Sequence, residues 1–159
     1  MGPFRNGKGW LLLALMSAWG CNARSAPEAA GLLKLERTIP LDRVAGRIDH
    51  LAVDLQRQRL FIAELGNGTV EGVDLKTGTS FARIGGLKEP QGLAFLAEKD
   101  ELAVATGGDG YVRFYRGEDL APAGGLAAGD DADNLRVTTK GQLVVGSDAL
   151  KLIDPKSRT

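Results

Sequence analysis

DHLAV at residues 49–53 is the stretch that decides the fold, because similar stretches recur as QGLAF at residues 91–95 and DNLRV at residues 133–137. The central leucine of each copy lies 42 residues after the previous one. A second apolar run follows each copy, and the three runs are RLFIA at 59–63, ELAVA at 101–105 and QLVVG at 142–146. The chain therefore contains an internal repeat, which is the signature of a repeat architecture.

Each repeat predicts one small antiparallel sheet. A third apolar segment follows a glycine-rich turn, as in GNGTV at 66–70 and GDGYV at 108–112. A period of about 40–45 residues with four short strands is typical of a β-propeller blade. Such a small sheet cannot bury both faces alone, so its neighbours must stack around an axis. We expect an all-β domain over residues 31–159, with about three four-stranded blades near 47–88, 89–130 and 131–159.

The same residues resemble a known family. LFIAELGNGTVEGVDLKTGT at 60–79, RIDHLAVD at 47–54 and GDDADN at 129–134 are similar to YVTN-type β-propellers, periplasmic relatives of the NHL-repeat and gluconolactonase-like propellers. The resemblance covers about residues 34–159. It implies a ring of six or seven blades, of which this chain would hold about three.

A partial ring leaves two interpretations open. The first is a truncated gene product or partial sequence, with further blades needed to close the ring. The second is a half propeller that closes the ring with a second copy of itself. Residues 33–41 are predicted to form an outer strand, which in the resembling family completes the last blade.

Residues 1–30 predict a signal peptide, with an N-terminal signal helix and a short linker. Arg5 and Lys8 precede the apolar run WLLLALM at 10–16, and small residues follow it. The run is shorter than the ~20 residues that span a bilayer. Cys21, the only cysteine, ends AWGC at 18–21, which resembles a bacterial lipobox; cleavage after Ser25 would instead remove it. We expect a periplasmic or exported protein, lipid-anchored in the first case and soluble in the second.

Composition excludes several classes of function. The 20 Lys and Arg residues balance the 20 Asp and Glu residues, whereas nucleic-acid binding needs a basic surface. A single histidine and a single cysteine exclude a His-rich or Cys-cluster metal centre, so we predict no cofactor. A divalent cation at the propeller axis is expected only if the protein is a hydrolase.

The candidate ligand-binding residues lie at the repeat starts. In a propeller, the loop into the innermost strand opens on the central channel, where ligands bind. The candidates are Asp49, His50, Gln91, Asp133 and Asn134 at this position, with Asp109, Glu64 and Asn67 on or near the glycine-rich turns.

Two of these features have competing interpretations. His50 beside Asp49 is either an oriented acid or base or a histidine hydrogen-bonded between adjacent blades. The acidic loop at 130–133 is predicted to be a solvated turn, because ligands of a divalent ion should converge from several blades.

The pattern favours a non-catalytic binding or scaffold module whose partner is an unknown protein or small molecule. The alternative is a metal-dependent hydrolase of the lactonase kind, with carboxylate and amide ligands at the axis. Asp49, Asp133 and Asn134 would be its candidate ligands.

Overall fold

The computed structural model describes residues 33–158. The chain divides into two units, residues 1–37 and 38–159, and the described residues of the first contain neither helix nor strand. The predicted signal helix, its linker and Cys21 lie outside the described residues. In the described part of the chain, no helix has the length and apolar character needed to cross a membrane.

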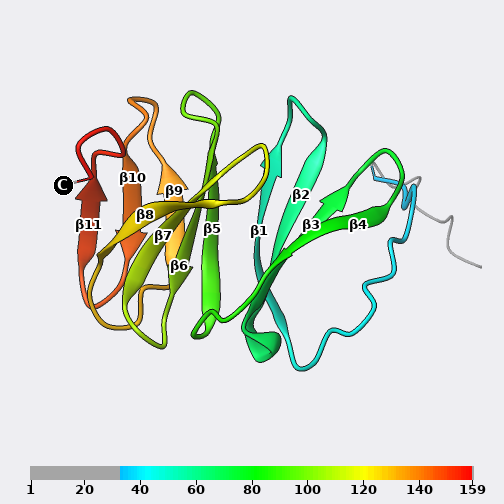
Figure 1. Cartoon of the computed structure of the whole chain (residues 1–159), viewed down its shortest axis with the longest axis horizontal. Helices are drawn as coiled ribbons and strands as arrows, with labels where there is room; N and C mark the ends of the chain where they lie inside the picture. Colours follow the sequence, from blue (N-terminus) through cyan, green and yellow to red (C-terminus); the bar gives the residue numbers. More distant parts are fainter. Residues whose placement is uncertain (1–32, 159) are drawn as a thin grey trace, which may run out of the picture. The chain divides into compact units, whose positions relative to one another are not determined.

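The second unit consists of three antiparallel sheets, which we call blades 1, 2 and 3 (Figure 1). Blade 1 contains β1 (Ile48–Asp54), β2 (Arg59–Glu64), β3 (Thr69–Asp74) and β4 (Thr79–Ile84), with a 3-10 turn, η1 (Leu65–Asn67), between β2 and β3. Blade 2 contains β5 (Pro90–Leu96), β6 (Glu101–Thr106), β7 (Tyr111–Arg116) and β8 (Pro122–Ala127). Blade 3 contains β9 (Asn134–Val137), β10 (Leu143–Gly146) and β11 (Leu150–Ile153). The predicted all-β fold of propeller blades is confirmed, although blade 3 contains three strands and not the four expected.

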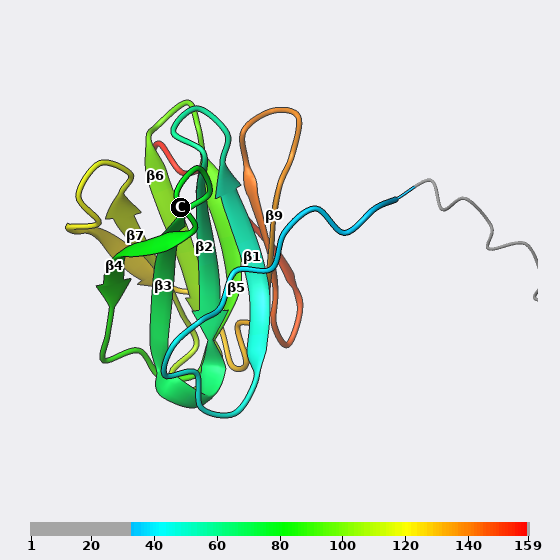
Figure 2. The ribbon, with the colours of Figure 1, turned by 90° about the vertical axis from the view of Figure 1, so that its right-hand side faces the viewer.

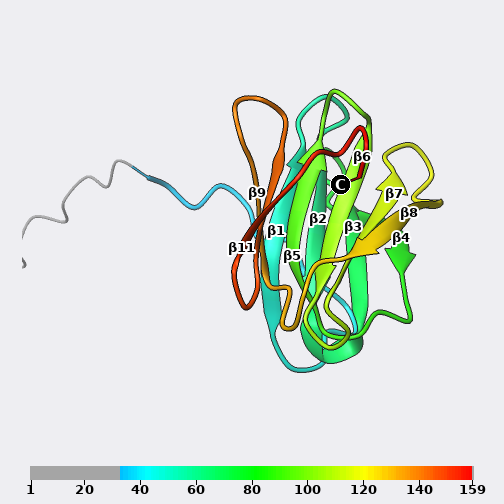
Figure 3. The same cartoon turned by 90° about the vertical axis from the view of Figure 1, so that its left-hand side faces the viewer.

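The blades are arranged radially. Each strand pairs with the next one in sequence, so β1, β5 and β9 are the first strands of their sheets. These three strands lie side by side, whereas β4 and β8 lie on the opposite side of the unit (Figures 2 and 3). The starts of β1, β5 and β9 therefore lie at one end of the blades, which we call the entry rim.

Apolar side chains hold the blades together. Between blades 1 and 2 the Phe61 ring stacks on the Phe95 ring with centroids 5.8 Å apart. Between blades 2 and 3 the buried side chains include Val112, Phe114, Leu135, Leu143 and Val145. The two inner strands of blade 2, β5 and β6, are covered on both faces, which is why they are apolar almost throughout rather than alternating with polar residues.

Aspartates at strand ends form the turns at the other end of the blades. Asp54 Oδ1 accepts hydrogen bonds from the backbone N–H groups of Gln56 and Arg57, 3.0 and 3.1 Å away. Asp74 and Asp154 make the same kind of turn after β3 and β11. These side chains replace backbone partners that the turn lacks, so the repeated Val-Asp or Ile-Asp endings have a local structural cause.

An arginine links blades 1 and 2 across these turns. Arg57 donates to Asp54 Oδ2 in its own blade at 2.9 Å. It also donates to both oxygens of Asp100 in blade 2, at 2.6 and 2.7 Å. We call these three residues the Arg57 clasp. Burial alone would raise the pKa of Asp54, but the hydrogen bonds from Arg57 and the turn outweigh it, so this pKa lies below its ordinary value.

One predicted strand is absent. Residues 33–41 form no strand, because no described strand edge pairs with them. The following residues are held to blade 1 by Asn67, whose side chain accepts from the Ala45 N–H at 2.7 Å and donates to the Arg43 carbonyl at 2.7 Å. Asn67 therefore fixes a loop.

Candidate functional site

A β-bulge at the start of β1 shapes the entry rim. Ile48 pairs with Glu64 and Leu51 pairs with Ile62, so Asp49 and His50 together oppose the single residue Ala63. An extra residue breaks the alternation of side chains between the two faces of a strand and redirects those beside it. The bulge is therefore the local reason that Asp49 and His50 can approach the same point.

Blade 2 repeats this bulge and brings blade 3 close. Pro90 pairs with Thr106 and Leu93 with Val104, which leaves two residues, Gln91 and Gly92, in the bulge. A Cβ on Gly92 would lie only 2.0 Å from the Asp133 carbonyl oxygen of blade 3. Glycine is required here because only a backbone without a side chain permits so close an approach.

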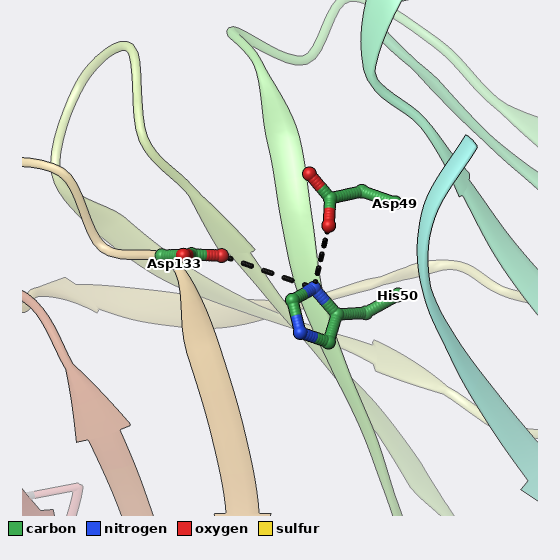
Figure 4. A group of neighbouring side chains, drawn as sticks. All are labelled: Asp49, His50 and Asp133. Carbon is green, nitrogen blue, oxygen red and sulfur yellow. Dashed lines mark ion pairs between the residues drawn. The ribbon is translucent and has the colours of Figure 1, made fainter. Parts of the chain in front are cut away.

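Asp49, His50 and Asp133 converge at the entry rim, and we call them the His50 cluster (Figure 4). His50 Nδ1 lies 2.9 Å from Asp49 Oδ1 and 3.8 Å from Asp133 Oδ1. Arg47 Nη2 donates to the other oxygen of Asp49 at 2.9 Å. The cluster thus joins the first blade to the third.

Two atoms of the His50 cluster are shielded from solvent and make no hydrogen bond, although both take part in the ion-pair contacts within the cluster. Among the described residues, His50 Nδ1 and Asp133 Oδ1 are two of only four buried side-chain nitrogen or oxygen atoms that make no hydrogen bond. A shielded polar atom that makes no hydrogen bond has lost its hydration without the bond that would replace it. The cluster is therefore incomplete as a hydrogen-bonded structure.

These donor atoms suit a small cation. An imidazole nitrogen and two carboxylate oxygens are the ligand types that bind Zn²⁺, with bonds of about 2.0–2.2 Å and ligand atoms about 3.4 Å apart in a tetrahedron. The distances from Nδ1 to the two carboxylates, 2.9 and 3.8 Å, lie on either side of that spacing. Within residues 33–158 no other group of three histidine, cysteine or acidic side chains converges in this way.

The other predicted site residues do not join the cluster. Gln91 is buried and its Nε2 donates to Asp131 Oδ1 at 3.3 Å, which links blade 2 to the acidic loop. Asn134 begins β9, and its Oδ1 accepts from Arg136. Both remain at the entry rim, as the repeat position predicted, but their polar groups are engaged by neighbours.

Asp109 is held inside blade 2. Its carboxylate accepts hydrogen bonds from Arg113 at 2.6 and 3.1 Å and from the Thr106 hydroxyl at 2.5 Å. The hydrogen bonds from Arg113 lower the pKa of Asp109 despite the opposing effect of burial. This geometry favours a structural role for Asp109 in the turn between β6 and β7.

Sequence reasoning missed two contributors to the site. Arg47 is the first residue of the first repeat, and its contact with Asp49 lies beside the bulge at the start of β1. Gly92 stands at the position of His50 in the second repeat, and that replacement of a large residue by glycine was a readable signal of close backbone approach.

The fold and the rim together define the class of this chain as a partial β-propeller with an acidic, histidine-containing entry rim. Its structure is similar to a solved chain of hydrazine synthase from Kuenenia stuttgartiensis, with a TM-score of 0.64 and 16% sequence identity. The match covers 82% of this chain and 36% of that one, so this chain spans about a third of its length. No protein-family model and no curated protein matches. At this identity the likeness establishes the fold alone.

Proposed function

We propose that this chain is part of an exported propeller of the YVTN type that acts as a binding module, with the His50 cluster as its binding site. The observation that carries the proposal is that two solvent-shielded atoms on different blades, His50 Nδ1 and Asp133 Oδ1, lie 3.8 Å apart and make no hydrogen bond. A ligand that satisfies both atoms removes a cost that the protein alone leaves in place.

A divalent cation is the ligand that fits these atoms best. One nitrogen and two carboxylate oxygens favour Zn²⁺ over Ca²⁺, since Ca²⁺ takes six to eight oxygen ligands. Binding requires a neutral imidazole and ionised carboxylates, because a metal ion takes the place of the proton on each ligand. By joining Asp49 and His50 to Asp133, the cation would also hold blades 1 and 3 together at the rim.

Calorimetric titration of the untagged chain with Zn²⁺ and, separately, with Ca²⁺ tests this proposal. We expect one Zn²⁺ per chain and weaker binding of Ca²⁺. His50→Ala and Asp133→Asn should each weaken Zn²⁺ binding at least about 100-fold, because each removes a ligand. The matched control is Asp130→Asn, an exposed carboxylate on the same loop, which should leave the affinity unchanged. Equal affinity in all four proteins would exclude the His50 cluster as the site.

The convergence of metal-type ligands also supports the second candidate, a metal-dependent hydrolase. Such an enzyme needs a base as well as ligands, and both carboxylates of the cluster are already assigned as ligands. The binding module is therefore the better proposal. Hydrolysis of simple lactones by the Zn²⁺-loaded chain, lost in His50→Ala, would reverse that preference, whereas no turnover with bound Zn²⁺ would remove the enzyme.

Export rests on the pattern of residues 1–30. Cell fractionation with fatty-acid labelling in a bacterial host tests it, with Cys21→Ser as the control. Label on the wild type that is lost in Cys21→Ser indicates a lipid anchor; an unlabelled, shortened periplasmic chain indicates cleavage after Ser25. An uncleaved chain in the cytoplasm would contradict export.

A further inference from the structure

Blade 2 shows which sheet faces a propeller blade buries. Its back face, with Leu93, Leu102, Val104 and Tyr115, packs on blade 1. Its front face, with Ala94, Ala103, Val112 and Phe114, packs on blade 3. The 42-residue repeat assigns equivalent positions to the back face of blade 1 and to the front face of blade 3.

The back face of blade 1 is uncovered along its first strand. Leu51 is the equivalent of Leu93, yet Leu51 is 55% exposed where Leu93 is 3% exposed. Val53 and Ile48 are exposed on the same strand. The outer part of this face is closed, because Ile62 and Val73 are buried. The uncovered strip therefore runs along β1.

The front face of blade 3 is uncovered in the same way. Leu150 and Leu152 occupy the positions of Val112 and Phe114, as the pairing of β10 with β11 and of β6 with β7 shows. Val112 and Phe114 are fully buried, whereas Leu150 is 79% and Leu152 is 59% exposed. Exposed leucines on a regular sheet face at positions that the middle blade buries mark an interaction surface.

The back face of blade 1 and the front face of blade 3 carry charges of opposite sign. On the back face of blade 1, Glu64 and Glu71 share one cation, Arg83. The Glu64 side chain is fully buried, and its Oε1 makes no hydrogen bond. On the front face of blade 3, Arg136 stands where blades 1 and 2 have Ala52 and Ala94. The first face therefore holds two buried carboxylates on one cation, a net negative charge beneath its surface, and the second carries an added positive charge.

We propose that a second copy of this chain covers both faces, with the back face of blade 1 in one copy packed on the front face of blade 3 in the other. This contact continues the packing already present between blades 1 and 2 and between blades 2 and 3. Two copies make it twice, so three blades from each copy close a ring of six, within the usual four to eight for propellers. Closure leaves neither face open to further copies.

The test is the mass of the full chain in solution, measured by sedimentation equilibrium with Leu51→Asp, Leu152→Asp and the control Leu55→Asp. We expect the wild type at twice 16.8 kDa. Leu51→Asp and Leu152→Asp should each raise the dimer dissociation constant at least about 100-fold, because both contacts then bury a charge. Leu55, 83% exposed in the turn after β1, lies on neither face and should tolerate aspartate without effect.

Mixing the two disruptive variants tests the head-to-tail geometry. A Leu51→Asp copy and a Leu152→Asp copy retain one unaltered contact between them, so the mixture should associate more tightly than either variant alone. Circular dichroism melting shows whether each variant is folded. If one misfolds, Arg136→Glu replaces it, and should weaken the dimer by opposing Glu64 and Glu71.

Three results would overturn the proposal. A monomeric wild type would mean that something else, such as further blades of a longer chain, covers these faces. Polymers that grow with concentration would mean that the contact does not close. An unchanged dimer in both Leu51→Asp and Leu152→Asp would place the interface elsewhere.

Discussion

The charged side chains at the two ends of the blades differ in how completely they are hydrogen-bonded. In the Arg57 clasp, the guanidinium donates to carboxylates of blades 1 and 2, and Asp54 also accepts from the turn backbone. In the His50 cluster the residues also come from two blades, but His50 Nδ1 and Asp133 Oδ1 make no hydrogen bond. A satisfied network stabilises a fold, whereas an unsatisfied one costs stability unless something else completes it. The difference separates a structural contact from a candidate binding site.

The largest expected effect comes from adding a side-chain atom at Gly92, where blades 2 and 3 approach each other closely beside the His50 cluster. In Gly92→Ala the new Cβ would overlap the Asp133 carbonyl, so blade 3 must move away from blade 2. We expect a loss of about 2 to 3 kcal/mol in unfolding free energy, together with loss of Zn²⁺ binding. Urea unfolding and calorimetry measure the two effects. Gly86→Ala is the matched control for binding, since its Cβ would meet nothing within 4 Å, although its positive φ costs some stability. Wild-type Zn²⁺ affinity in Gly92→Ala would show that the position of blade 3 relative to blade 2 does not matter for the site.

A smaller effect is expected in the Arg57 clasp. Asp54→Asn keeps an oxygen for the turn but loses the charge that binds Arg57, and we expect a loss of about 1 to 2 kcal/mol at neutral pH. Urea unfolding measures it. The Zn²⁺ affinity should not change, because the clasp lies at the other end of the blades. A weakened Zn²⁺ affinity would show that the two ends are not independent.

The pH dependence of the unfolding free energy shows whether the charge of Asp54 stabilises the folded chain. Because the pKa of Asp54 is lowered in the folded chain, its contribution is present above the unfolded value of ~3.9 and is lost as pH falls through the folded value. The stability gap between wild type and Asp54→Asn should therefore shrink below about pH 4. Urea unfolding between pH 3 and 7 checks this, and a gap that widens toward acid would contradict it.

The smallest effect on stability is expected within the His50 cluster. Asp133→Asn removes a carboxylate oxygen that has no hydrogen bond, so without metal the unfolding free energy should change by less than about 0.5 kcal/mol. Added Zn²⁺ should raise the melting temperature of the wild type and leave that of Asp133→Asn unchanged. If urea unfolding without metal showed that Asp133→Asn loses about 2 kcal/mol or more of unfolding free energy, Asp133 would instead be a structural residue like those of the Arg57 clasp.

The sequence predicted the blades well because their signals are periodic. The equivalent leucines Leu51, Leu93 and Leu135 fixed the repeat, and the strands lie where the runs predicted them. The repeat position also predicted that five polar residues, Asp49, His50, Gln91, Asp133 and Asn134, would face one rim, but not which of them would converge. It could not predict their partners, because these depend on contacts between distant residues.

Particular residues show where that prediction ends. Asp109 and Gln91 have the same sequence character as the cluster residues, yet Arg113 and Asp131 engage them. No local pattern distinguishes these cases. The bulge that directs Asp49 and His50 depends on pairing with β2, and is likewise absent from any single stretch of sequence.

Because the chain has a single histidine, binding of a cation by His50 Nδ1 together with Asp49 and Asp133 can be observed directly. Nitrogen-15 NMR of histidine-labelled protein reports on that one imidazole ring during a Zn²⁺ titration. We expect a change in the Nδ1 resonance that is complete at one Zn²⁺ per chain and absent from Asp133→Asn at the same concentrations. An Nδ1 resonance that stays constant throughout the titration of the folded wild type would contradict such binding.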